Sequence, residues 1–163
     1  MNRTRNREGI ERYGRFTERE SDRLETALNR CFVEIILPAI FDIERDLIDF
    51  DYWYQLDISQ DGTLRSGKPR IKRVTLSFYP EKKSRLGLRS PRMDSIDHAV
   101  VKPSADLKNI VFIIEYATAV SSMDPEETQT YALEDISKKT VNRFLEDFVM
   151  DATDAYKSER ILR

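Results

Sequence analysis

The sequence predicts one α+β domain, in which an antiparallel sheet of about four strands is flanked by an N-terminal helix and a C-terminal amphipathic helix. Three observations predict this class. Apolar residues recur at helical spacing near both ends of the chain, and they alternate with polar residues in between. The chain has 163 residues, the length of one ordinary domain. We therefore expect a single α+β domain over residues 17–163, preceded by a flexible basic tail over residues 1–16.

The first helix is predicted to begin at Thr17, because Thr17 and Glu20 form a capping-box pattern. Its apolar stripe consists of Leu24, Ala27, Leu28, Cys31, Ile35, Ala39 and Ile43. Pro38 lies inside this pattern, and proline removes a helical hydrogen bond. A straight helix over residues 18–49 would also be about 48 Å long, against about 40 Å for a domain of this size. The helix is therefore expected to be bent or broken near Pro38, or to overhang and pack against a second chain.

Four strands are predicted between the helices. They cover residues 52–58, 70–79, 98–102 and 110–120. The first two alternate between apolar and polar residues and are separated by the turn signal Asp61-Gly62, which predicts a hairpin. The last is almost entirely apolar, as expected of a strand that is covered on both faces. The polar residues 80–95 are predicted to form a long loop, of the kind that is often functional or disordered.

The C-terminal helix has the clearest periodicity. Its apolar stripe consists of Val141, Phe144, Leu145, Phe148, Ala152 and Tyr156. Asp135 or Ser137 is a suitable cap. Residues 128–134 fit a strand and a helix equally well, whereas Asp124-Pro125 has the pattern of an earlier helix start.

Charge is segregated along the chain, although the net charge is only −2. Residues 65–92 contain ten Lys and Arg but one acidic residue, whereas residues 18–64 contain twelve acidic and four basic residues. Binding of an acidic protein surface or of nucleic acid is expected to use the cations of the predicted loop, which are Lys82, Lys83, Arg85, Arg89 and Arg92. Phe78 and Tyr79 are the only aromatic residues in the basic stretch, so nucleic acid is not the favoured ligand. Alternatively, the strand cations Arg70, Lys72 and Arg73 neutralise the acidic helices.

The apolar content of the first helix exceeds one stripe. Phe32, Ile36, Ile40 and Phe41 lie away from the stripe on an α-helical projection. We expect them to form a dimer interface, since two-fold homodimers are the commonest oligomers. The alternative is that a thick monomer core buries them.

No catalytic signature is recognisable in the sequence. The five glycines form no phosphate-binding loop, and one cysteine with one histidine cannot build a zinc site. Cys31 lies in the most apolar part of the first helix and is interpreted as a packing residue rather than as a partner of His98. Glu34 and Glu115 each interrupt an apolar run. They are interpreted as structural carboxylates that pair with cations or reach the surface, in preference to ligands of a divalent metal. No cofactor and no metal are expected.

The sequence therefore favours a non-catalytic binding or assembly module, a homodimer that acts through protein–protein contacts. The alternative is a nucleic-acid-associated protein that uses residues 65–92, and a weaker one is an acid-rich enzyme that depends on a divalent metal. No run of about 20 apolar residues is present, so no membrane association is expected. A single cysteine and the lack of an apolar signal core suit a cytoplasmic protein.

Overall fold

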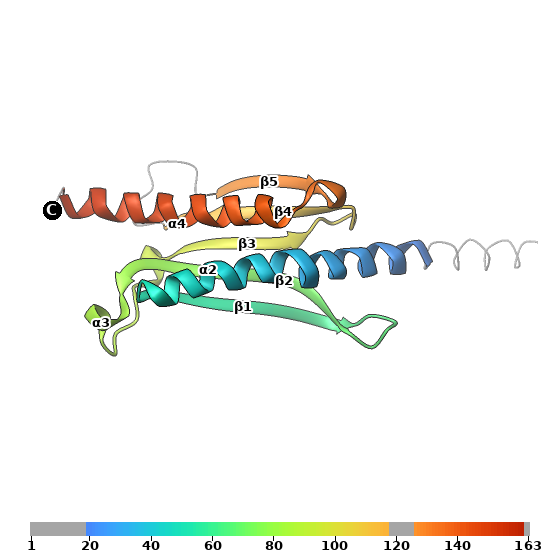
Figure 1. Cartoon of the computed structure of the whole chain (residues 1–163), viewed down its shortest axis with the longest axis horizontal. Coiled ribbons are helices and arrows are strands. Elements are labelled where there is room, and N and C mark those ends of the chain that lie inside the picture. Colours follow the sequence, from blue (N-terminus) through green and yellow to red (C-terminus); the bar gives the residue numbers. More distant parts are fainter. Residues whose placement is uncertain (1–18, 118–125, 162–163) are drawn as a thin grey trace, which may run out of the picture.

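The computed structural model describes residues 19–117 and 126–161, with side chains up to residue 158. It has a five-stranded antiparallel sheet in the order β1-β2-β3-β4-β5, so each strand pairs with its neighbours in sequence. The strands are β1 (Tyr52–Thr63), β2 (Pro69–Lys82), β3 (Asp97–Pro103), β4 (Asn109–Glu115) and β5 (Glu126–Ala132). Both long helices lie on the same face of this sheet (Figure 1). The α+β class is confirmed, with one strand more than expected.

The N-terminal helix is continuous over residues 19–49, but its winding changes before Pro38. Residues 19–31 are α-helical, η1 (Phe32–Ile36) is a π-helical segment, and α2 (Leu37–Asp49) returns to α-helix. The amide of Leu37 donates to the carbonyl of Phe32, five residues back. This wider turn ends just ahead of Pro38, which lacks an amide hydrogen and would clash with the carbonyl four residues back. The irregularity expected at Pro38 is thus a π-helical segment, across which the helix continues.

The π-helical segment also aligns the apolar residues of the helix. Leu28, Phe32, Ile36 and Ile40 follow each other at intervals of four. In an α-helix each such interval overshoots one turn by about 40°, so the row would drift around the helix. The extra residue in the wide turn absorbs this drift, and all four side chains are buried. Much of the apparent surplus of apolar residues therefore belongs to a single buried stripe, which the π-helical segment keeps on one side of the helix.

The strand predictions hold for β1 to β4, with altered ends. β1 and β2 form the expected hairpin, and Leu56 lies opposite Leu76. β4 ends at Glu115, and residues 118–120 of the predicted strand lie outside the described residues. The ambiguous residues 128–134 divide between the edge strand β5 and the short helix η3 (Leu133–Asp135).

The long loop expected over residues 80–95 is largely structured. β2 continues to Lys82, and two short helices follow, α3 (Lys83–Leu86) and η2 (Met93–Ser95). The predicted tail 1–16, the cap Thr17 and the helix start at Asp124-Pro125 lie outside the described residues.

The C-terminal helix α4 (Lys138–Ile161) begins at the predicted cap Ser137, whose hydroxyl oxygen accepts the amide of Thr140 at 3.2 Å. Its apolar stripe packs on the sheet and on the first helix. Aromatic side chains join the layers: Phe78 contacts Phe148, and Phe112 contacts Phe144. In Figure 1 the two long helices run side by side in the same direction. Among the described residues, no helix has the length and apolar character needed to span a membrane.

Candidate functional site

The basic residues that follow β2 form a defined surface, here called the basic end (residues 82–93). Asp51, in the turn between α2 and β1, anchors it. The Asp51 carbonyl accepts the amide of Lys83 at 2.7 Å, and its carboxylate accepts the amide of Ser84 at 3.2 Å. Asp51 has a φ of +59°, a left-handed conformation that Asp tolerates better than most residues. Pro91 and Ile96 are buried and hold the other side of this segment.

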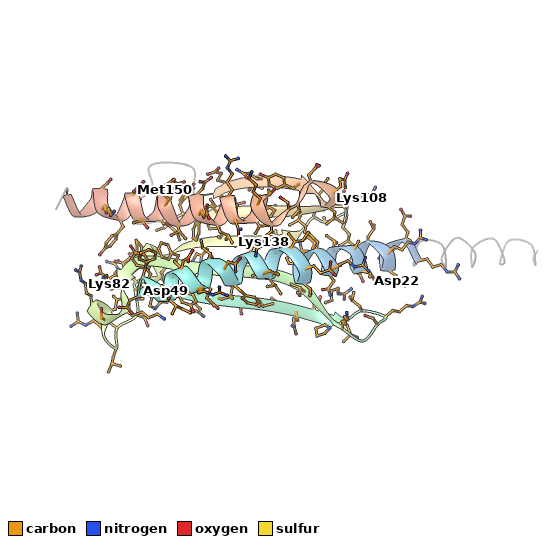
Figure 2. The ribbon with its side chains drawn as sticks, viewed as in Figure 1. Asp22, Asp49, Lys82, Lys108, Lys138 and Met150 are labelled. Carbon is orange, nitrogen blue, oxygen red and sulfur yellow. The ribbon has the colours of Figure 1, made fainter. Side chains whose placement is uncertain are left out.

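The five predicted cations of the basic end are all exposed. Arg85 lies 3.7 Å from Glu81, and Arg92 lies 2.9 Å from Asp94. Within the described part of the chain, Lys82, Lys83 and Arg89 form no ion pair. The arginine of each pair is more than half exposed, so an approaching anion can compete for the paired arginines as well. The segment that carries the five cations lies at one end of the molecule, where Figure 1 shows α3 and Figure 2 labels Lys82.

Two large apolar side chains accompany these cations. Leu88 has an exposed fraction of 108%, and Met93 has one of 79%. Gly87, with a φ of +62°, ends α3 and directs the chain away immediately before Leu88. Sequence reasoning missed Leu88 because a single leucine between arginines carries no periodic signal. The basic end is therefore amphipathic, because two exposed apolar side chains occur among its exposed cations.

The other cations of the basic stretch are mostly neutralised within the chain. Arg70 binds the Glu25 carboxylate of the first helix at 2.7 Å and donates to the carbonyl of Asp61 at 2.8 Å. Arg73 lies 3.5 Å from Glu115 on β4. Lys72 is exposed, and no ion pair of its side chain occurs within the described residues. The strand part of the basic stretch is thus paired at two of three positions, so the excess positive charge lies at the basic end.

The edge strand β1 borders the basic end. Lys83 Nζ lies 4.8 Å from the centre of the Tyr54 ring, a cation–π contact. Burial raises the pKa of the Tyr54 hydroxyl, and the nearby Glu44 carboxylate raises it further through its charge and a hydrogen bond. Glu44 of α2 therefore faces Tyr54 of β1, which fixes the side of the helix that borders the edge strand.

The four predicted dimer-interface residues divide into two groups. Phe32, Ile36 and Ile40 have at most 1% of their side chains exposed and lie in the core of the single chain. Phe41 is 45% exposed. Ile48 lies two turns further along the same side of α2 and is 55% exposed. Phe41 and Ile48 flank Glu44, so the apolar surface of α2 lies beside β1.

The open face of the sheet, opposite the helices, carries the only histidine. His98 Nδ1 lies 2.8 Å from Ser77 Oγ, and Glu115 is the cross-strand neighbour of His98 on β4. A serine, a histidine and a carboxylate thus lie in one row. The carboxylate, however, engages Arg73, and none of the grooves found among the described residues includes this row. The row is best explained as polar cross-strand pairing on a solvated sheet face.

Cys31 and the two carboxylates in apolar runs, Glu34 and Glu115, lie in different surroundings. Cys31 is buried on the helix side of the sheet, and burial raises the pKa of its thiol to about 11. Glu34 is exposed, and Glu115 forms the ion pair with Arg73. No cluster of three or more metal-ligating side chains occurs among the described residues.

Several grooves adjoin the helices. One of about 390 Å³ lies between the first helix and the far ends of β2 and β3, where Arg70, Lys72 and Lys102 contribute to its lining. Another of about 350 Å³ separates α2 from α4 and includes Phe50 and Met150. Comparison with known protein families, with curated proteins and with solved structures finds no match to this chain.

Proposed function

We propose that this protein is a non-catalytic binding module that engages an acidic segment of a partner protein through its basic end. The observation that carries the proposal is the exposure of Leu88 among cations, three of which, Lys82, Lys83 and Arg89, have no ion pair among the described residues. A fully exposed leucine on an anchored segment gains favourable free energy only when a partner covers it.

The chemistry of this surface favours a protein over a nucleic acid. Protein interfaces combine a buried apolar centre with a polar rim, and the exposed Leu88, close in sequence to the exposed Arg85, Arg89 and Arg92, offers that combination. Single-stranded nucleic acids are bound by exposed aromatic side chains on which bases stack, and residues 82–93 contain none. A phosphate backbone would use the cations but would leave Leu88 without a partner.

The proposal is tested with three labelled probes of equal charge: an acidic peptide with interspersed leucines, the same peptide with serine in place of leucine, and a single-stranded DNA. Fluorescence anisotropy at physiological ionic strength gives each affinity. We expect the leucine-containing peptide to bind most tightly. The Leu88→Ser variant should remove its advantage over the serine peptide, and the Lys82→Ala/Arg89→Ala variant should weaken both peptides.

The matched control is Lys108→Ala/Lys139→Ala, which removes two exposed cations elsewhere on the molecule; Figure 2 shows Lys82 and Lys108 at opposite ends. This control should leave all three affinities unchanged. Two outcomes would reject the proposal. If DNA binds most tightly with a strong salt dependence, the nucleic-acid alternative is favoured. If both peptides bind equally and Leu88→Ser has no effect, the apolar centre has no role in binding.

A further inference from the structure

We propose that β1 is a pairing edge for a second copy of this chain, so that two sheets join antiparallel across a two-fold axis at Leu56. This goes beyond the proposed function, because it concerns a different surface and a different partner. β1 is the first strand in the sheet order and has only β2 as a neighbour among the described residues. Its outer backbone amides and carbonyls along residues 53–59 therefore offer a template for another strand.

The two edges of the sheet differ in the side chains that surround them. β5 is polar, and its first five residues, Glu126 to Thr130, are all exposed. β1 carries Trp53, Tyr54, Leu56 and Ile58, which are half-buried. Charged and polar edges discourage strand pairing, whereas apolar edges favour it. β1 is therefore the edge that is suited to association.

The first helix extends the apolar character of this edge. Glu44 faces Tyr54, so Phe41 and Ile48, three residues before and four residues after Glu44, lie on the side of α2 that borders β1. Both side chains are about half exposed. When two sheets join edge to edge in register, their helices lie on the same side of the joined sheet. Phe41 and Ile48 of both copies would then cover the new seam.

A second copy fits this edge because the strand is complementary to itself. An antiparallel pairing centred on Leu56 sets Tyr54 opposite the partner's Ile58, an aromatic and β-branched pair on the helix face. On the open face it sets Gln55 opposite the partner's Asp57. Within residues 53–59, no two like charges lie directly opposite each other. A two-fold arrangement of this kind is closed and leaves neither β1 edge exposed.

The charges at the two ends of β1 favour the same direction. Lys83 lies over Tyr54 at the start of the strand, whereas Asp57 and Asp61 are exposed in its second half. Antiparallel pairing brings the cationic start of one strand toward the acidic end of the other. Parallel pairing would place cations beside cations and carboxylates beside carboxylates.

The test uses Gln55, which is exposed and pairs with Ser77 within the chain. Sedimentation velocity from 1 to several hundred micromolar should show the wild-type mass rising from 19.2 kDa toward twice that value. The Gln55→Glu substitution would create two like-charge pairs with Asp57 per dimer, and it should weaken dimerisation about tenfold. The Gln55→Lys substitution would create two opposite-charge pairs and should strengthen dimerisation.

The control is Gln129→Glu at the same kind of exposed position on β5, which should leave dimerisation unchanged. A second readout is amide hydrogen exchange at residues 53–59, which should slow as concentration rises while exchange in β5 does not. A wild-type mass that stays at 19.2 kDa at every concentration overturns the proposal. So does a dimer that Gln129→Glu weakens and Gln55→Glu does not. Circular dichroism confirms that each variant is folded.

Discussion

The side-chain oxygen Oδ1 of Asn29 accepts a hydrogen bond from the backbone amide of Ile71 at 3.0 Å. Asn29 is the one buried polar or charged side chain among the described residues. The bond crosses from the first helix to β2, where the register of the β1–β2 pairing shifts next to Gln60. It provides a partner for a backbone amide at a point where the ladder is irregular, and it ties the helix to the hairpin.

Replacing Asn29 with alanine should therefore destabilise the fold, because the amide of Ile71 would remain buried without an acceptor. We expect the free energy of unfolding to fall by about 1–3 kcal/mol. Urea denaturation measures this value, and the control is Thr26→Ala, an exposed residue one turn earlier in the same helix. Thr26→Ala should change stability by at most about 0.5 kcal/mol. Equal effects of the two substitutions would show that the hydrogen bond has no net contribution.

The neighbours Ile40 and Phe41 should respond differently to truncation. Ile40 is 1% exposed and Phe41 is 45% exposed. Ile40→Ala creates a core cavity and should lower the free energy of unfolding by about 2–5 kcal/mol. Phe41→Ala should cost far less in a dilute monomer, and it should weaken self-association. Urea denaturation at low micromolar concentration measures the stability of the monomer. Sedimentation at high concentration measures self-association, so the two effects are separated. A large loss of monomer stability from Phe41→Ala would contradict its place at the surface.

Cys31 should make stability depend on pH in the alkaline range. Burial raises the pKa of its thiol from an ordinary value of 9.0 to about 11. The folded state thus keeps a proton that the unfolded state loses, so stability is full below about pH 9 and decreases as pH rises from about 9 to 11. Comparing wild type with Cys31→Ala by denaturation between pH 7 and 11 isolates this contribution. The decrease should be shallower in the variant, and identical slopes would argue against a buried protonated thiol.

Asp51 should tolerate asparagine but not alanine. Its left-handed φ of +59° and its bond to the amide of Ser84 suit a short side chain with an acceptor oxygen. Asp51→Asn keeps both properties and should stay close to wild type. Asp51→Ala loses the acceptor and is strained at this φ, so it should be less stable than Asp51→Asn by about 1 kcal/mol. Urea denaturation of the two variants tests this order.

The sequence predicted the class of the fold for a physical reason, whereas of the strand cations expected to neutralise the acidic helices only Arg70 pairs with a helix and Arg73 pairs with Glu115 of β4. Residues on a buried face are apolar and residues on an exposed face are polar. The alternation in β1 and β2 and the helical spacing in α4 therefore indicate which face of each element is buried. Arg70 pairs with Glu25, as expected of a strand cation that faces an acidic helix. The five cations from Lys82 to Arg92 are exposed at the surface where a partner could reach them.

The features that the sequence did not reveal depend on tertiary context. The residues of β5 are polar on both faces, so they carry no alternation that separates strand from helix. Phe32, Ile36 and Ile40 seemed to lie off the stripe because an α-helical projection ignores the π-helical segment. Their four-residue spacing ahead of a proline was the signal that could have indicated it. The exposure of Leu88 depends on the turn at Gly87, and residue type alone does not give it.

The parallel course of the two long helices has an electrostatic consequence for the basic end. The peptide dipoles of a helix place a partial negative charge at its carboxyl end. The carboxyl end of α2 leads into Asp51, whose carbonyl accepts the amide of Lys83, and Tyr156 near the end of α4 donates to the Glu81 carboxylate. The negative pole of α2 therefore lies next to the place where α3 begins, and the carboxyl end of α4 lies at the same end of the molecule (Figure 1). The pole of α2 offsets part of the mutual repulsion of the cations there, so a dense group of lysines and arginines destabilises this end of the molecule less than it otherwise would.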